Sequence, residues 1–231
     1  SFIENNLIYN VGRGVFQKSP DRDLLNSNIV RRNIFYNIAV AAYSLRVQGV
    51  GAAPALNGQF YENIVYNSIG GVSSSLYETS SQSTGMFIYN NTFVNVNVPV
   101  KIRGQDDVEI YNNIFSKPSS LNFATEASTG YGNKNGIRYM GNNLYHNDPG
   151  IWILERYSSS PVEFRSLTSW QNATGPGLAE NPGNGSYEGV PEFIAETNYD
   201  FHLMTNAKAR TGGRNNGEGL GAYGLNTNII G

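Results

Sequence analysis

Apolar residues and asparagines recur in one fixed pattern between Ile3 and Asn147. Each unit has an apolar residue, two variable positions, an Asn, a variable position and a second apolar or aromatic residue, and most units carry another Asn two positions later. Such alternation, closed by Gly, Ser, Asn or Pro, predicts a strand with one buried face that ends in a turn. The pattern occurs six times, and the Asn that anchors each unit is, in order, Asn6, Asn33, Asn63, Asn91, Asn113 and Asn143.

The spacing between these anchors decides the class of fold. Successive anchors are 27, 30, 28, 22 and 30 residues apart, and no unit has the 3.6-residue apolar period of a helix. A repeat of this length without a helix cannot form a helical solenoid, so it predicts an all-β fold, a parallel β-helix of six coils. Strands of neighbouring coils should then stack about 4.8 Å apart.

The anchor asparagines have a structural explanation. A sharp turn between strands favours a residue that tolerates left-handed or bridge dihedral angles, and Asn is such a residue. Its amide can also donate to, and accept from, the same amide one coil away, which predicts a ladder of stacked side chains. Two positions later a second column is expected inside the coil, formed by Ile8, Phe35, Val65, Phe93, Phe115 and Tyr145.

Composition narrows the functional classes. Only 15% of the 231 residues are charged, and 26 are Gly, which excludes a helical bundle or coiled coil. A hydrophobic content of 39% is too high for disorder, and no apolar run is long enough for a membrane span. The net charge of −2 gives no general attraction to nucleic acid or anionic lipid, so neither is an expected partner. The chain contains no Cys, which excludes disulfides, thiolate metal sites and a Cys nucleophile.

The Asn column and its N-N-x-[FIY] units resemble the right-handed parallel β-helix proteins of the pectate-lyase-like superfamily. The segment FRSLTSWQNATG at 164–175 looks like the short Trp-containing helix that follows the last coils of many secreted bacterial members. The segments VPEF at 190–193, NYDFHL at 198–203 and GLGAY at 219–223 look like their closing segments, whereas AKARTGG at 207–213 departs from the S-P-A-x-D-x-G of that group. The resemblance implies a right-handed β-helix that is secreted or displayed at the cell surface.

The C-terminal part of the chain is predicted to form a cap on the solenoid. From about Ser158 the Asn period is lost, Pro and Gly become frequent, and large apolar residues such as Trp170 and Phe201 appear. Because the last coil of a solenoid exposes a strand edge and apolar side chains, we expect coils over 1–157 and a capping segment over 158–231, packed on the last coils. No amphipathic cap precedes Ile3, so we expect an upstream domain or another subunit to cover the first coil.

Candidate functional residues lie on a second strand, about twelve residues past each anchor. Alternation there points Val100 and Ile102 inward and Lys101 and Arg103 outward. A cationic stripe with interleaved aromatic rings suits an acidic polysaccharide, because guanidinium binds carboxylate in a bidentate manner and Tyr stacks on sugar rings. Solvated polar side chains without a ligand are the alternative. By the same logic the outward set includes Lys18, Arg46, Tyr77, and Glu155 or Arg156.

One stretch resembles a narrower group. The sequence VKIRGQDDVEIYNN at 100–113 is similar to the L-x-L-R-x-G-x(5)-V-x-N-N stretch of the chondroitinase B and alginate-lyase group, whose Arg at the position of Arg103 belongs to the active site. That group also has a Lys, which falls here on Gln82, and two calcium-binding Glu, which fall on Ser75 and Tyr77. A lyase must neutralise the uronate carboxylate and remove a proton with a base. Arg103 suits the first task and Gln82 does not suit the second.

Two functional hypotheses therefore remain open. The first is an enzyme, a lyase or hydrolase for an acidic glycan, in which Arg103 and Lys101 bind carboxylate and Tyr77 is the candidate base. The second is a non-catalytic carbohydrate-binding or structural module, or a fragment of a larger enzyme. The enzyme and the carbohydrate-binding module predict an acidic polysaccharide as the partner, whereas a structural module requires none. No cofactor is expected; if calcium binds, the sequence does not identify its ligands. In either case Lys18, Arg46, Glu155 and Arg156 are expected to contact the substrate.

Overall fold

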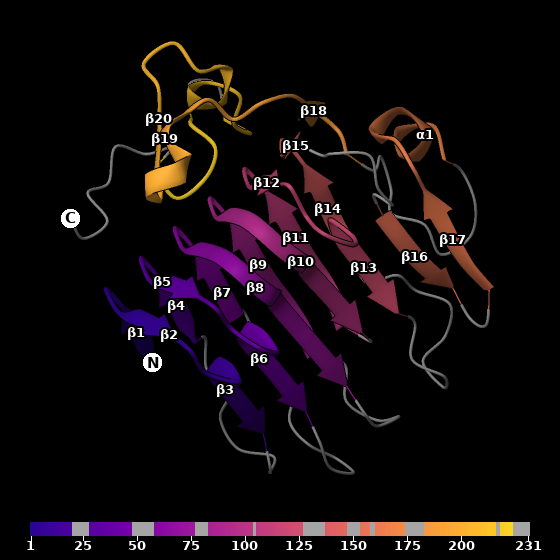
Figure 1. Cartoon of the computed structure of the whole chain (residues 1–231). Helices are drawn as coiled ribbons and strands as arrows, with labels where there is room; N and C mark the ends of the chain where they lie inside the picture. Colours follow the sequence, from indigo (N-terminus) through magenta and orange to yellow (C-terminus); the bar gives the residue numbers. More distant parts are fainter. Residues whose placement is uncertain are drawn as a thin grey trace.

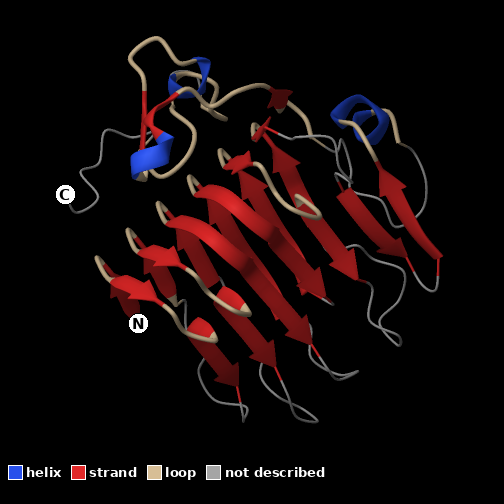
Figure 2. Cartoon of the chain, in the orientation of Figure 1, coloured by secondary structure: helices blue, strands red, loops and turns tan. Residues whose placement is uncertain are grey.

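The computed structural model describes residues 1–19, 28–47, 58–76, 83–103, 105–126, 137–146, 153–157, 160–173, 183–215 and 218–223. These residues form a parallel β-helix (Figure 1), whose strands run across the long axis of the solenoid. Strands dominate, and the short helices lie at the ends and edges of the stack (Figure 2). Within these ranges no helix is long and apolar enough to cross a membrane.

One wall of the solenoid is a six-stranded parallel sheet to which each sequence repeat contributes one strand. Neighbouring strands pair in the register that aligns the first apolar residue of each repeat, so that Ile3 lies opposite Val30 and Val30 opposite Phe60. The stacking order of the strands therefore follows the chain. The six strands are β1 (Phe2–Glu4), β4 (Ile29–Arg31), β7 (Gly58–Tyr61), β9 (Ser83–Tyr89), β11 (Gln105–Tyr111) and β14 (Ile137–Gly141).

The larger sheet follows the Asn turn in each repeat. In the third and fourth repeats a single long strand covers this sheet, and in the other repeats two shorter strands do so. The strands directly after the turn are β2 (Leu7–Tyr9), β5 (Ile34–Tyr36), β8 (Ile64–Leu76), β10 (Thr92–Arg103), β12 (Ile114–Ser116) and β15 (Leu144–His146), followed by β18 (Tyr187–Glu188). The second set of short strands is β3 (Arg13–Ser19), β6 (Ala41–Val47), β13 (Phe123–Glu126) and β16 (Ile153–Tyr157).

The predicted asparagine ladder is confirmed. The Asn33 side-chain amide donates to Asn63 Oδ1 over 3.1 Å, and the Asn33 main-chain N–H donates to the same oxygen over 3.0 Å. The same Nδ2 also donates to the carbonyl oxygens of Ile3 and Arg31. Each later anchor repeats this arrangement until Asn143, whose main-chain N–H donates to Ser186 Oγ over 3.0 Å. The anchor amides are thus paired inside the stack, as buried amides require.

The left-handed turn conformation does not lie where the sequence predicted it. None of the six anchors has a positive φ. The residue before each anchor has one instead, between 51° and 60°, in the series Asn5, Arg32, Glu62, Asn90, Asn112 and Asn142. The anchor is therefore Asn because its amide reaches several partners at once, while the preceding residue supplies the turn and has only to tolerate the left-handed region.

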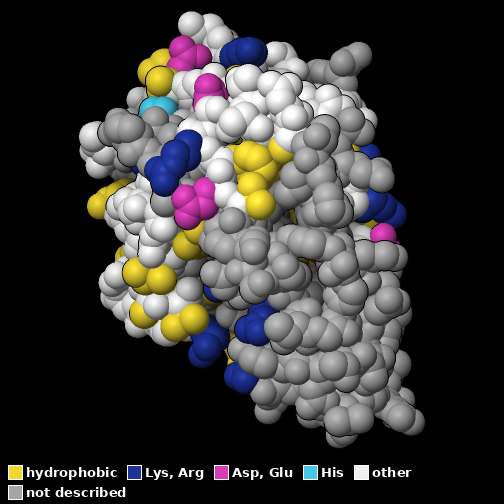
Figure 3. Space-filling view, turned by 90° about the vertical axis from the view of Figure 1, so that its right-hand side faces the viewer, with side chains coloured by type: hydrophobic (Ala, Val, Ile, Leu, Met, Phe, Trp, Pro, Cys, Tyr) yellow, Lys and Arg dark blue, Asp and Glu magenta, His cyan; other side chains and the backbone are white. Residues whose placement is uncertain are grey.

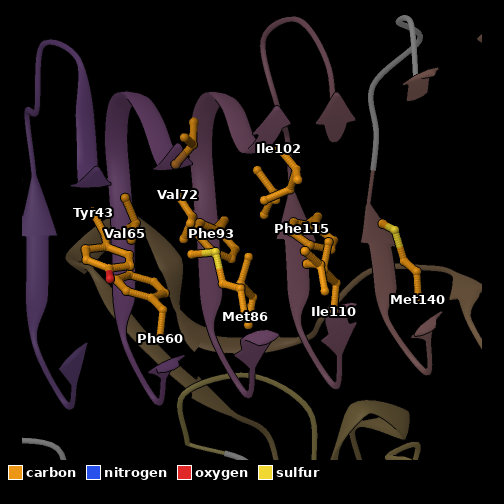
Figure 4. Packing of buried hydrophobic residues seen from close by; sticks show 14 of the residues in the cluster. Tyr43, Phe60, Val65, Val72, Met86, Phe93, Ile102, Ile110, Phe115 and Met140 are labelled. Carbon is orange, nitrogen blue, oxygen red and sulfur yellow. The ribbon is translucent and has the colours of Figure 1, made fainter. Parts of the chain in front are cut away.

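The predicted inner column is buried as expected. Phe35, Val65, Phe93, Phe115 and Tyr145 have no exposed surface, and Ile8 is partly buried at the first coil. Neighbouring rings stack along the axis, with centroids 5.4 Å apart between Phe93 and Phe115 and 5.3 Å apart between Phe115 and Tyr145. In Figure 4 the side chains of both walls point into the same space, where Tyr43 lies beside Phe60.

The far end of the solenoid carries the Trp-containing helix. Strand β17 (Ser160–Phe164) pairs antiparallel with β16 and leads into α1 (Leu167–Gln171). Ser166 starts the helix, because its hydroxyl accepts a hydrogen bond from the Ser169 main-chain N–H, which otherwise lacks a partner in the helix. Trp170 is fully buried in the same apolar cluster as the inner column.

The rest of the C-terminal segment follows a path that the sequence did not indicate. Residues 190–215 and 218–223, here called the strap, contain β19 (Phe193–Ala195), η1 (Glu196–Asn198), β20 (Asp200–Leu203) and η2 (Lys208–Arg210). In Figure 1, β19 and β20 lie beside the solenoid and away from α1. The strap packs on the outer side of the larger sheet, and its buried side chains include Phe193, Phe201, Leu203 and Leu220, packed against Ile64, Val94, Ile114 and Leu144 of the sheet.

Candidate functional site

The candidate basic stripe lies on the larger sheet, where the second strands of the repeats pair. Lys18 pairs with Arg46, and Arg46 pairs with Ser75 on β8. On the other side of β10, Arg103 pairs with Glu126, and Glu126 pairs with Arg156. Since β8 lies between β6 and β10, these positions follow one line along the solenoid axis, here called the Arg103 column: Lys18, Arg46, Ser75, Arg103, Glu126 and Arg156.

Burial confirms which way the predicted residues point. Val100 and Ile102 have 0% and 2% of their surface exposed, whereas Lys101 and Arg103 are half-buried. On β6, Leu45 is buried and Arg46 is half-buried. Because side chains on a strand alternate between faces, the Arg103 column lies on the outer face of the sheet.

The backbone register extends across the Arg103 strand in both directions. Lys101 pairs with Ser73 on one side and with Ala124 on the other. Two residues after Lys101, the Arg103 main-chain N–H donates to the Ser74 hydroxyl oxygen over 3.4 Å, so β10 and β8 stay in contact up to this point, and the same register sets Ser75 opposite Arg103. Lys101 and Arg103 therefore occupy neighbouring outward positions of one strand, two residues apart.

The structure describes only part of the remaining predicted residues. Tyr77 lies outside the described residues. The backbones of Lys18, Glu155 and Arg156 are described and their side chains are not. The register puts Arg156 in the Arg103 column, whereas Glu155 pairs with Thr125, the partner of the inward-pointing Ile102.

One member of the Arg103 column was not predicted from the sequence. Glu126 occupies the position between Arg103 and Arg156. Alternation within β13 would have indicated that Glu126 shares a face with Ala124, the partner of Lys101. The connections between coils differ in length, however, so the sequence alone did not show which residue of β13 lies opposite Arg103.

A column of stacked tyrosines lies on the outer face of the six-stranded sheet. Tyr61, Tyr89 and Tyr111 stack with centroid distances of 4.7 and 5.1 Å and nearly parallel rings. Burial raises the pKa of Tyr89, with the neighbouring Tyr61 and Tyr111 hydroxyls adding to the effect. Tyr89 has a ring on each side, Arg31 lies over Tyr61 and Arg214 lies over Tyr111, so this stack offers little open ring surface to a sugar. Because its pKa is raised, the Tyr89 hydroxyl is a poor base at neutral pH.

An ion cluster borders this aromatic stack. The Glu109 carboxylate, 6% exposed as a residue, accepts hydrogen bonds from Arg138 and, over 2.8 Å, from Arg214 of the strap. The Arg214 guanidinium lies over Tyr139, 4.1 Å from the ring centroid. Although burial alone would raise it, the pKa of Glu109 is lowered by its hydrogen bonds to Arg138 and Arg214. This cluster holds the strap on the solenoid and leaves the Glu109 carboxylate fully engaged.

The two histidines do not form a nucleophilic or metal site. The ring Nδ1 of His146 lies 3.0 Å from Ser116 Oγ, but Ser116 is only 1% exposed and cannot reach a substrate. His202 Nδ1 lies 2.6 Å from Asp200 Oδ1 on the exposed side of β20, and its ring stacks on Tyr223. The described part of the chain contains no group of three or more His, Cys, Asp or Glu residues that could hold a metal ion.

The face of the molecule drawn in Figure 3 carries side chains of several types. On the face drawn in Figure 3, Lys and Arg side chains occur in small groups among polar, acidic and apolar ones. The alignment of basic residues in the Arg103 column is evident from the strand register.

Comparison of the chain with protein-family models, curated proteins and solved structures gives no match. The parallel β-helix itself rests on the strand pairing and on the asparagine ladder described above.

Proposed function

We propose that this protein binds an acidic polysaccharide along the Arg103 column. The observation that carries the proposal is the register, which brings Lys18, Arg46, Arg103 and Arg156 into one line across separate repeats. A line of guanidinium groups on a rigid sheet can meet successive carboxylates of one extended polymer. The resemblance of the repeats to the pectate-lyase-like superfamily favours a polysaccharide over other polyanions and favours a secreted or surface location.

Binding is proposed in preference to catalysis because Gln82 stands where the lyases that the sequence resembles have their Lys, so the catalytic set of that group is incomplete. An elimination reaction needs a carboxylate binder and a base within hydrogen-bond reach of one sugar ring. Ser73 and Ala124, which pair with Lys101, are not bases. Glu126 pairs with Arg103 on β13 and is of a residue type that can act as a base, but its side chain lies outside what the structure describes. Tyr77, the candidate base from the sequence, stays a prediction.

The proposal is tested by measuring the affinity of the protein for polygalacturonate, alginate and hyaluronan by calorimetric titration at low and moderate salt. Binding should weaken as salt rises, because ion pairs at an exposed surface are screened over about 8 to 10 Å. The Lys101→Ala/Arg103→Ala variant should lose most of the affinity while its unfolding midpoint stays near that of the wild type.

A matched control removes two cations elsewhere. Arg165, which is exposed and paired with Glu163, and Lys208, which lies over the Tyr187 ring, are outside the Arg103 column. The Arg165→Ala/Lys208→Ala variant has the same change in net charge and should bind like the wild type. Equal losses in both variants, or no binding to any of the polymers, would contradict the proposal. Absorbance of an unsaturated product in the same mixtures would show turnover and restore the enzyme hypothesis.

A further inference from the structure

A column of exposed asparagines follows the axis of the solenoid along the larger sheet. Its four members all have a left-handed backbone, with φ between 48° and 54°. They are Asn10, Asn37, Asn67 and Asn95, here called the outer amide column. The Asn37 amide donates to Asn10 Oδ1, and the Asn95 amide donates to Asn67 Oδ1. Between these two pairs, Asn37 Oδ1 and Asn67 Nδ2 have no hydrogen-bond partner among the described residues, so both are available to a ligand.

A column of tyrosines runs beside the outer amide column, one residue earlier in the chain. Tyr9 pairs with Tyr36 and Tyr36 with Tyr66, and their rings stack with centroids 4.8 and 5.2 Å apart. Tyr199 of the strap adds a fourth ring, 5.0 Å from Tyr66. These four residues, here called the tyrosine column, are exposed or half-buried, and within the described part of the chain their hydroxyls make no hydrogen bond. Because stacking holds the rings in place, binding a ligand through the hydroxyls costs little side-chain entropy.

An apolar strip borders the outer amide column on its other side. Ala39 and Ile69 come two residues after Asn37 and Asn67, and both are exposed. Ile69 has 54% of its surface exposed, although it lies in the third repeat and not at an end of the solenoid. The surface therefore offers hydroxyls, amides and an apolar side chain, and none of the residues named is charged. A sugar suits this combination, since it presents hydroxyl groups beside C–H groups.

We infer that the tyrosine column, the outer amide column and Ile69 form a second binding site, for an extended neutral polysaccharide that lies along the solenoid axis. The ring spacing of 4.8 to 5.2 Å is comparable with the rise of one sugar in an extended β-1,4-linked chain. Each successive sugar would then meet one tyrosine hydroxyl and one asparagine amide. An amide donates and accepts at once, as adjacent sugar hydroxyls require. Asn95 and Arg103 lie toward opposite ends of β10, so this inference does not rest on the proposed function.

The test compares cellohexaose, an extended neutral chain, with maltohexaose, the same glucose units in a curved α-1,4-linked chain, by calorimetric titration of the whole protein. Cellohexaose should bind more tightly. Its affinity should not change between low and moderate salt, because the site forms no ion pair that salt could screen. The Tyr36→Phe/Tyr66→Phe variant keeps the stacked rings and removes two hydroxyls. Its affinity for cellohexaose should fall about fivefold, the scale of two neutral hydrogen bonds.

Two further variants make the test specific to this surface. Tyr89→Phe/Tyr111→Phe makes the same chemical change in the stack on the six-stranded sheet and should bind cellohexaose like the wild type. Asn37→Gly/Asn67→Gly removes two amides at positions of positive φ, which Gly adopts without strain, and should weaken the binding of cellohexaose.

Polygalacturonate separates this site from the Arg103 column. The Tyr36→Phe/Tyr66→Phe and Asn37→Gly/Asn67→Gly variants should bind it as the wild type does, and a loss of that affinity would overturn the inference of a second site. No binding of cellohexaose, equal binding of the two hexamers, or an unchanged affinity for cellohexaose in both variants would also overturn it. Failure of the wild type to bind polygalacturonate would contradict the proposed function alone.

Discussion

Tyr199 of the strap stacks on Tyr66 of β8, with ring centroids 5.0 Å apart and planes 28° apart. Tyr66 in turn stacks on Tyr36, and Tyr36 on Tyr9, at 5.2 and 4.8 Å. Residues of three successive repeats thus form a column of rings on the outer face of the sheet, and the strap supplies the fourth ring. On the next strand, β10, the residue paired with Tyr66 is Val94, which has no ring. The aromatic column of the repeats therefore ends at Tyr66, and Tyr199 of the strap extends it.

Tyr199 follows η1 directly, and its backbone is left-handed there. Its φ is 62°, in the left-handed region that costs a residue with a Cβ roughly 1 kcal/mol or more. We expect Tyr199→Ala to destabilise the protein by about 1 kcal/mol, because stacked aromatic pairs contribute about 0.5 to 1.5 kcal/mol beyond their buried area. Urea unfolding followed by tyrosine fluorescence measures the change.

Two further variants separate the effect of the Tyr199 ring on stability from the effect of its backbone conformation. Tyr199→Phe keeps the stack and should unfold at nearly the wild-type urea concentration. Tyr199→Gly loses the ring but relieves the left-handed strain, so it should be more stable than Tyr199→Ala. An alanine variant as stable as the wild type would show that the ring does not hold the strap.

The second prediction concerns the middle of the asparagine ladder. Asn91 is fully buried, and its side chain donates to Asn113 Oδ1 over 3.0 Å and to the Phe60 carbonyl oxygen over 2.8 Å. Asn91→Ala should lower the free energy of unfolding by roughly 1 to 3 kcal/mol, because it leaves buried main-chain groups of the neighbouring coils without partners. The midpoint of thermal unfolding reports this loss.

An exposed asparagine of the same chain provides the comparison. Asn95 is exposed, and its side chain donates only to Asn67 Oδ1, over 2.7 Å. Its φ is 51°, so Asn95→Gly removes the side chain without a backbone penalty and should change the unfolding midpoint little. Equal midpoints for Asn91→Ala and the wild type would contradict a stabilising ladder.

The third prediction is a dependence of stability on pH at the strap. The Glu109 carboxyl has a pKa below its ordinary value in the folded chain, since its bonds to Arg138 and Arg214 outweigh the opposing effect of burial. Tyr111, Tyr139, Asp107 and Glu218 also lie in this charged environment. A lowered folded pKa gives stability that is present above the unfolded Glu pKa of about 4.3 and is lost as the pH falls through the folded value.

Glu109→Gln measures this contribution. At pH 7 the variant should unfold with a free energy lower by roughly 1 to 3 kcal/mol, because hydrogen bonds to charged groups contribute on that scale. As the pH falls below the unfolded Glu pKa of about 4.3 and through the lower folded value, the difference from the wild type should shrink, because the wild-type carboxylate becomes protonated. A difference that stays constant over this range would mean that the charge of Glu109 is not what holds Arg214.

Much of the solenoid could be predicted from the sequence because the responsible interactions recur. Each repeat carries its own Asn and its own inward aromatic residue, and identical residues one coil apart satisfy one another, so the period alone predicts the ladder at Asn63 and the buried column at Phe93. The alternation of Val100, Lys101, Ile102 and Arg103 likewise predicted the faces of β10, since this depends only on the geometry of a strand.

The path of the strap and the alignment of the Arg103 column were decided by the tertiary structure. Phe201 and Ala222 lie in no repeat, so nothing in their spacing indicates that they pack on Val94 and Ile114, more than 80 residues earlier in the chain. Whether Arg46, Arg103 and Arg156 share one line depends on how the unequal connections between coils set the register of each strand. Local pattern fixes the face on which a side chain lies, whereas only the hydrogen bonds between coils fix which residue lies beside it.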